Sequence, residues 1–350
     1  RQPIQHPAND MTTDIITTHF DYHSIDGNLL KLDILGHDDP TMIKMLEDLT
    51  GVNARAIPLD DPDTMSIFTS SKVLGFENDE ILGPTGAVAI PEFNTRFTRG
   101  MLMDTMPKDF NPLVRLSGFS HGTDVWMGNA RELILSGTAS VLETVGCRDD
   151  IMLYLISKGL DPKMSFKIME KVRKGIIAKG KCPQWPQWKE DMKAHGVPDW
   201  YIWSCEKIKY MFPKAHAAAY VMMAWRIAYC KVFYPLAYYA AYFSIRATGF
   251  SYELMCQGKD RLENYMKDYK KRKDTLSNKE QDVFKDMRIV QEMYARGFDF
   301  MPLDIYRAHP NRFQIIDGKL MPAINSIDGL GDNAAIYISE AAKDGPFLSK

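Results

Sequence analysis

Asp33 is the residue whose position most needs a chemical explanation. It interrupts the apolar run of residues 29–35, which favours a buried strand. Burial of an unpaired carboxylate is costly, so a buried Asp33 would need a metal ion or a strong hydrogen-bond donor beside it. Lys31 lies on the same face at the strand period of two, so an edge strand with one wet face explains the pattern equally well. The sequence leaves a metal-binding carboxylate and a solvated one both open.

A second candidate site lies in residues 118–126, where Ser120, His121 and Thr123 occupy a turn that leads into a helix. Hydroxyl groups and backbone N–H groups at the positive end of a helix suit an anion or a polar base edge. The alternative is a plain capping turn with Asp124 or Thr123 as the N-cap and Trp126 in the core.

Residues 209–220 form a third candidate, because Lys214 and His216 fall in the first turn of a helix that follows Pro213. The helix macrodipole disfavours cations at that end, so two of them suggest a ligand that offsets the cost. The alternative is a solvated lysine and a partly buried histidine with ordinary partners.

The fourth candidate is a glycine turn at residues 324–338. Gly329 and Gly331 precede an apolar helix that carries Asn333 near its start. This order matches a helix-hairpin-helix, in which backbone N–H groups meet a DNA phosphate without reading sequence. A plain glycine turn before a helix is the alternative.

Positive charge gathers in two parts of a chain whose net charge is only −2. Residues 165–181 carry six cations and one acid, and residues 205–235 carry five cations and one acid, whereas residues 59–80 are acidic. Solvated helix faces would explain either basic cluster. Two such clusters in nearby helices, both interleaved with aromatic residues, also suit a wall that binds phosphate.

Helices must position these residues, and the fold class we predict is mainly α with a small β portion. The 350-residue chain is 45% hydrophobic and long enough for two or three domains. Short β-like runs occur only around residues 29–35, 313–316 and 320–321, and residues 176–188 read as a loop. Apolar residues recur at helical spacing in residues 39–49, 92–106, 125–135, 148–157, 164–174, 198–211, 215–231 and 236–246, and two polar helices follow between residues 250 and 297.

The cysteines and the apolar runs narrow the classes of protein. The five cysteines have no close pair, which argues against a zinc site and against a disulfide framework and favours a reducing cytoplasm. No apolar run approaches the length of a membrane span, so we expect no membrane partner.

Taken together, these segments resemble the C-family replicative DNA polymerases of bacteria, most closely the PolC type of DNA polymerase III catalytic subunit. The resemblance covers essentially the whole chain, in order. It rests on residues 17–24, 28–40, 90–93, 120–126, 146–152 and 210–217, and on a tail that runs from 329–331 to 347–349.

The resemblance implies a fragment of a longer chain. It implies the end of the palm in residues 1–60, the fingers in 61–250, and the start of the clamp-binding or duplex-binding region in 251–350, with the helix-hairpin-helix at 324–342. It places a palm aspartate at Asp33. That residue would be catalytic and would bind metal, since three carboxylates of the family hold two divalent ions, usually Mg²⁺. The paired aspartates that complete the site would lie upstream, so we expect the isolated fragment to be inactive.

The resemblance also assigns contacts in the fingers and on DNA. It implies that basic side chains neutralise the triphosphate of the incoming nucleotide and that a neighbouring pocket holds its sugar and base. The implied triphosphate residues are Arg148, Arg173 and Lys174; the implied pocket residues are Tyr210, Lys214 and His216, with Ser120, His121 and Thr123 as weaker candidates; and the implied DNA-binding residues are Gly329, Gly331 and Asn333.

The main functional hypothesis is therefore template-directed transfer of deoxynucleotides in chromosomal replication. The partners would be primer-template DNA, a dNTP and, through the full-length chain, the sliding clamp and other replisome subunits, in a bacterial cytoplasm at the nucleoid. The alternative is a non-catalytic DNA-binding module that grips duplex through basic helices and a helix-hairpin-helix.

Overall fold

The computed structural model describes residues 3–32, 34, 36–77 and 79–347 and divides into two compact units, Arg1–His37 and Asp38–Lys350. In the first unit, β1 (Ile4–Gln5) pairs antiparallel with β2 (Thr17–Thr18), and α1 (Tyr22–Ile25) follows. None of the described helices is long and apolar enough to cross a membrane.

The predicted strand at residues 29–35 is wrong where the structure describes it. Residues 29–32 and 34 adopt no strand, and Leu30 and Ile34 are 86% and 93% exposed. An apolar run becomes a buried strand only when a neighbouring strand satisfies its backbone groups, and no described strand pairs with this run. Asp33 itself lies outside the described residues.

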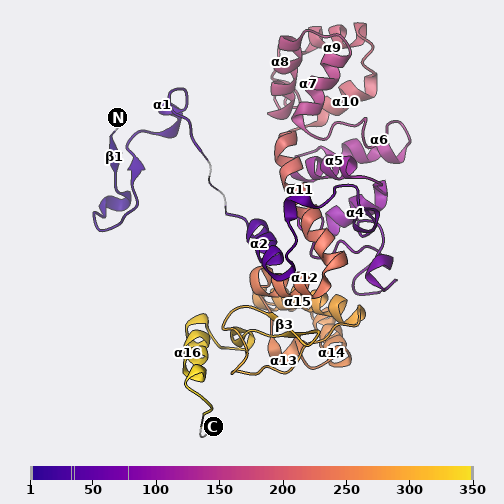
Figure 1. Ribbon diagram of the computed structural model, residues 1–350. Helices are drawn as coiled ribbons and strands as arrows, with labels where there is room; N and C mark the ends of the chain where they lie inside the picture. The colour runs from indigo at the N-terminus through magenta and orange to yellow at the C-terminus, as the bar shows by residue number, and fades with distance from the viewer. Residues whose placement is uncertain (1–2, 33, 35, 78, 348–350) are drawn as a thin grey trace. The chain divides into compact units, whose positions relative to one another are not determined.

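Helices are the main regular structure of the second unit, and its described strands form a single short hairpin, which confirms a mainly α fold with a small β portion (Figure 1). Its helices are α2 (Asp38–Thr50), α3 (Pro62–Ser66), α4 (Arg96–Thr105), α5 (Phe110–His121), α6 (Arg131–Leu135), α7 (Arg148–Ser157), α8 (Pro162–Arg173), α9 (Trp185–Ala194), α10 (Asp199–Lys207), α11 (Lys214–Phe233), α12 (Pro235–Ala241), α13 (Tyr252–Met255), α14 (Lys259–Lys271), α15 (Asn278–Ala295) and α16 (Asp332–Lys343). The strands β3 (Gln314–Ile316) and β4 (Lys319–Met321) form an antiparallel hairpin.

Several helices are shorter than their apolar spacing predicts. The helix expected at 92–106 begins at Arg96, because Glu92 has a left-handed backbone (φ 69°) and Thr95 caps the first turn. The helix expected at 125–135 becomes regular only at Arg131. The loop expected at 176–188 ends earlier, since α9 begins at Trp185. Apolar spacing continues through these turns because their side chains also enter the core.

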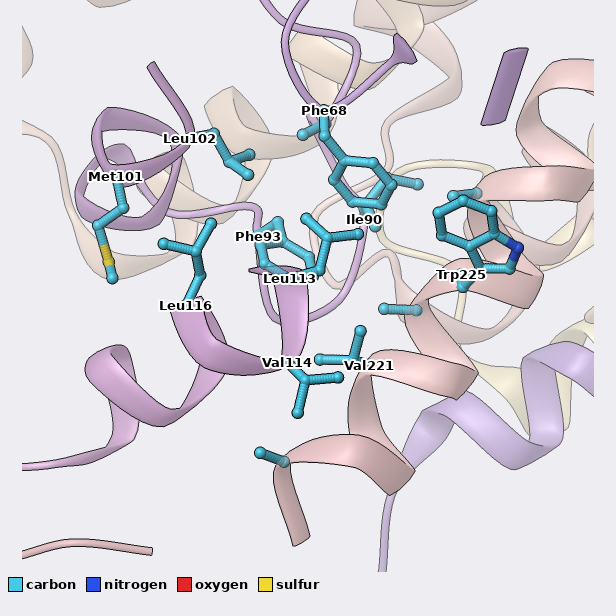
Figure 2. Packing of buried hydrophobic residues seen from close by; sticks show 14 of the residues in the cluster. Phe68, Ile90, Phe93, Met101, Leu102, Leu113, Val114, Leu116, Val221 and Trp225 are labelled. Atoms are coloured by element: carbon cyan, nitrogen blue, oxygen red, sulfur yellow. The ribbon is translucent and has the colours of Figure 1, made fainter. Parts of the chain in front are cut away.

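Helix α11 is the central element of the core. It packs against α2, α3, α5, α7 and α12, so it is apolar on several faces, as an enclosed helix must be. Figure 2 shows Trp225 and Val221 of this helix beside side chains from residues 68–116. The rings of Phe68 and Trp225 stack at 6.1 Å, and Phe93 meets Phe68 edge to face at 5.1 Å.

A buried ion pair joins α11 to α15. Lys231 and Glu292 are both fully buried, and Lys231 Nζ lies 2.7 Å from Glu292 Oε1. The ammonium also donates to the carbonyl oxygens of Gly86 (2.8 Å) and Val88 (2.6 Å), while the Tyr239 hydroxyl donates to Glu292. Burial lowers the pKa of Lys231 to about 8. Lys231 belongs to the basic cluster of residues 205–235, but its buried charge is paired inside the core and cannot reach a ligand at the surface.

The last hundred residues keep the predicted order of a polar helical hairpin followed by short strands. Ser277 and Glu280 form a reciprocal capping box that starts α15. In the β3–β4 turn, Asp317 and Gly318 both have positive φ (49° and 74°), the requirement of a type I′ turn.

Candidate functional site

Residues 209–214, which connect α10 to α11, bond through their backbone to three other parts of the chain. Lys209 N–H donates to the Thr123 carbonyl (3.1 Å), and Thr123 N–H donates to the Tyr210 carbonyl (2.9 Å). Met211 N–H donates to the Arg173 carbonyl (3.2 Å), and Arg148 N–H donates to the Phe212 carbonyl (3.1 Å).

These bonds bring four helix ends together, and we call this arrangement the junction. It comprises residues 209–214, the ends of α5 and α8, and the starts of α7 and α11. Helices α7 and α8 pack against each other, so their functional ends are held in one frame. Residues that are 38 to 87 positions apart in the sequence are therefore bonded to one another in one site.

Two glycines permit the close approach of these backbones. A Cβ at Gly175, which has φ +67°, would lie 2.5 Å from the Lys209 carbonyl oxygen. A Cβ at Gly122 would lie 2.9 Å from the Tyr210 carbonyl oxygen. Side chains at either position would push residues 209–210 away from α8 or α5.

The end of α8 presents two cations held by one acid. Glu170 Oε2 lies 3.0 Å from both Arg173 Nη2 and Lys174 Nζ. The hydrogen bond from Arg173, and then that from Lys174, lowers the pKa of Glu170 to about 2 despite some burial. Arg173 is half-buried and Lys174 is exposed. Because one carboxylate serves two cations, positive charge remains in excess at this helix end.

Two carboxylates of α7 lie at the start of α11, beside the first of its two cations. Asp149 accepts a hydrogen bond from Lys214 N–H (2.6 Å), and Asp150 Oδ1 lies 3.9 Å from Lys214 Nζ. Asp150 also accepts from Arg115 (2.9 Å) and from Cys147 N–H (2.9 Å). These carboxylates offset the cost of the Lys214 charge at this helix end, so its position alone does not indicate a ligand. The roles of Lys214 and His216 toward a nucleotide stay predictions.

His121 is oriented by polar partners and aromatic rings. Its Nδ1 lies 2.7 Å from the Ser117 carbonyl and 3.3 Å from Ser120 Oγ, and its Nε2 lies 3.2 Å from Glu92 Oε2. Its ring lies 5.5 Å from Phe212 and 5.7 Å from His216. The site thus combines a ring-lined part with a cationic part.

Comparison with known proteins shows which proteins this chain is similar to. Residues 39–196 match the family model of the bacterial DNA polymerase III alpha subunit finger domain. The chain is 53% identical over 347 residues to DNA polymerase III PolC-type of Caldanaerobacter subterraneus, 53% identical over 349 residues to that of Bacillus cereus, and 52% identical over 350 residues to that of Streptococcus agalactiae. Each alignment covers 99% of this chain.

The chain matches the fingers region of PolC-type DNA polymerase III, as a fragment of that protein. It spans about a quarter (24%) of the length of the relatives named above, and it contains the fingers region of that family. These names do not favour the non-catalytic DNA-binding module.

The junction gathers every residue predicted to face the nucleotide. Ser120 and His121 end α5, Thr123 follows it, and Arg148 begins α7. Arg173 and Lys174 end α8, Tyr210 lies on the connection, and Lys214 and His216 begin α11. Their roles toward a nucleotide remain predictions, but their proximity is a property of the fold.

The predicted DNA-binding residues lie elsewhere, at a turn before α16. Residues Ile324–Ser326 form a single 3-10 turn, Gly329 has φ +81°, and Gly331 is the N-cap of α16. Gly329, Gly331 and Asn333 are all exposed. A helix-hairpin-helix has a helix on each side of its turn, but here a single 3-10 turn precedes α16. The helix-hairpin-helix at 324–342 therefore stays a prediction.

The predicted metal centre falls outside what the structure describes, because Asp33 does. Among the described residues, no group of three or more His, Cys, Asp or Glu side chains could hold a metal ion. Mg²⁺ therefore stays a prediction.

Sequence reasoning missed the acids that orient the basic residues. Glu92, Asp149, Asp150 and Glu170 each contact a predicted site residue or its backbone. Glu92 and the two aspartates lie within the segments that carry the resemblance, which was the available signal. Glu170 lies three and four residues before its partners on α8, a spacing that predicts such ion pairs.

Proposed function

We propose that this chain supplies the fingers of a DNA-directed DNA polymerase and that the junction binds the triphosphate of an incoming dNTP. The observation that carries the proposal is the convergence of Arg148, Arg173, Lys174 and Lys214 at three helix ends held by one short connection. Phosphoryl transfer needs such preorganised positive groups, because charge develops on the departing pyrophosphate.

The triphosphate contacts follow from how each cation is held. Arg173 is fixed by Glu170, and a planar guanidinium can give a phosphate two parallel hydrogen bonds. Lys174 shares the same carboxylate but is exposed, so it can turn toward a phosphate at little cost. No ion pair is formed between Arg148 and any described residue, so its charge is available.

The ring-lined part of the junction suits the sugar and base. Tyr210 is exposed and meets Phe212 edge to face at 5.2 Å, and the His216 ring lies 5.0 Å from Phe212. Flat side chains beside a cationic site can stack against a base without reading its identity. Sequence would then be read by pairing with the template.

The longer protein would supply the rest of the activity. We propose primer-template DNA as the second substrate, and the sliding clamp and other replisome subunits as partners of the full-length chain. Asp33, with carboxylates from outside this chain, would hold two Mg²⁺ ions. The boundaries of palm (1–60), fingers (61–250) and clamp-binding region (251–350) belong to the same proposal, as does DNA contact by Gly329, Gly331 and Asn333.

Nucleotide kinetics of the full-length polypeptide test the proposal. Arg173→Ala should lower kcat/KM for dNTP by about 10- to 100-fold, the range expected for loss of a charge-assisted hydrogen bond of about 1.5–3 kcal/mol. Arg148→Ala should act in the same direction. Lys163→Ala is the matched control, because Lys163 is an exposed cation of the same helix α8 and lies about 15 Å from Arg173 along it.

Two results would overturn it. Unchanged kinetics in both arginine variants would remove the junction from the nucleotide site. An equal loss in Lys163→Ala would show that the effect is a general loss of electrostatic attraction for the nucleotide and not the loss of a contact at the junction.

A further inference from the structure

A second group of arginines lies apart from the junction, around a pocket of about 320 Å³. Its lining includes Arg96 and Arg99 of α4, Arg288 of α15, and the turn that contains Thr85. It shares no residue with the junction.

The positive charge of this pocket has little compensation. In the part of the chain that the structure describes, no carboxylate forms an ion pair with Arg96, Arg99 or Arg288. Glu80 is the single acid of the lining and is exposed. The charge of the buried Glu292 acts on Arg288, but Glu292 already forms an ion pair with Lys231. Burial, and then the charge of Arg99, lowers the pKa of Arg288 to about 10.

Buried polar atoms of the lining also lack partners. The Thr85 side chain is 1% exposed, and its Oγ1 has no hydrogen-bond partner. Arg99 donates one hydrogen bond from Nη1 to the Leu82 carbonyl (3.0 Å), but its buried Nε has none. A buried donor without a partner costs stability, so two of them at one cationic pocket call for an acceptor.

We propose that this pocket, the arginine pocket of Arg96, Arg99, Arg288 and Thr85, binds a phosphate-type oxyanion. Tetrahedral oxygens offer several acceptors at once, which matches three guanidinium groups and a hydroxyl. The same chemistry is presented by free inorganic phosphate or pyrophosphate and by the phosphodiester of a nucleic-acid strand. The site is independent of the nucleotide proposal above.

The test uses the full-length polypeptide and two probes, pyrophosphate and a short single-stranded oligodeoxynucleotide. Hydrogen–deuterium exchange is followed in peptides that cover residues 79–100 and 280–295, which locates binding at this pocket. We expect protection by one or both probes, and the probe that protects at the lower concentration identifies the source of the oxyanion. Arg96→Gln should raise the apparent Kd about tenfold without affecting the fold, because Arg96 is exposed.

Thr85→Val separates binding from stability. It removes a buried hydroxyl without a partner, so it should raise or preserve the melting temperature while it weakens protection by the anion. Arg55→Gln, a change of an exposed arginine outside the pocket, should alter neither. Absence of protection in these peptides, or protection that Arg96→Gln and Thr85→Val leave intact, would overturn the proposal, as would an acid from elsewhere in the polypeptide that fills the pocket.

Discussion

The junction and the buried pair hold positive charge in opposite ways. At the buried pair, the Lys231 ammonium donates its hydrogen bonds to Glu292 and to two carbonyl oxygens, and it has no access to solvent. At the junction, Arg173 and Lys174 share one acid, and their side chains remain 21% and 50% exposed. The junction fixes its backbone tightly and leaves the side-chain charge in excess.

This difference separates charge that supports the fold from charge that can serve a ligand. A cation whose partners are all internal is a structural element, and its loss should damage stability first. A cation on a rigid backbone with a shared carboxylate can change partner when a phosphate arrives. Substitutions in the two regions should therefore fail in different assays.

The largest effect is expected at the buried pair. Lys231→Met leaves the Glu292 carboxylate buried without its cation, which should cost about 3–5 kcal/mol of unfolding free energy. Urea denaturation measures the loss. Lys231→Met combined with Glu292→Gln should recover a large part, because no unpaired charge remains. A loss below about 1 kcal/mol for the single variant, too small for an uncompensated buried charge, would mean that the pair is not closed to solvent.

A smaller effect is expected where the backbones of the junction meet. Gly175→Ala and Gly180→Ala both place a side chain at φ +67°, which costs about 1–2 kcal/mol for either. Only at Gly175 would the new Cβ also meet the Lys209 carbonyl at 2.5 Å; nothing lies within 4 Å of it at Gly180. Gly175→Ala should therefore be the less stable variant by a further 1–3 kcal/mol or so.

The same two variants should also differ in activity. Gly175→Ala should reduce nucleotide use by the full-length polypeptide at temperatures where it remains folded, whereas Gly180→Ala should not. Equal stability of the two variants in thermal denaturation would show that residues 209–214 do not depend on the close approach at Gly175.

The smallest effect is expected in the acid range. The pKa of Glu170 falls from its ordinary value of 4.5 to about 2, chiefly because Arg173 donates to its carboxylate. A lowered carboxyl pKa adds stability that is present above about pH 4.5 and is lost as the pH falls toward 2. Glu170→Gln should therefore be less stable than the unsubstituted chain at pH 5, and this difference in unfolding free energy should shrink as the pH falls to 2.5. A constant difference across that range would contradict the ion pair.

Local patterns predicted most of the helices, and the resemblance named the residues that lie at the junction. Apolar spacing located α7, α8 and α11, and the capping box marks the start of α15. What no local pattern contains is the set of backbone bonds from residues 209–212 to positions 35 to 90 residues away. The gathering of the site is a tertiary property, and the resemblance alone pointed to it.

The errors have physical causes of the same kind. Lys231 cannot be told from a surface lysine by sequence, because its partner Glu292 lies 61 positions away. The apolar run at residues 29–35 has the composition of a strand, but a strand also needs a neighbour, and composition does not supply one. Pairing across long separations decides both cases.

The most direct measurement is a structure of the full-length polypeptide with primer-template DNA and a non-reactive dNTP analogue. We expect triphosphate oxygens within about 3 Å of the guanidinium groups of Arg148 or Arg173, with the base beside Tyr210 and His216. A triphosphate bound away from these residues, with the Glu170–Arg173 pair undisturbed and facing solvent, would contradict it.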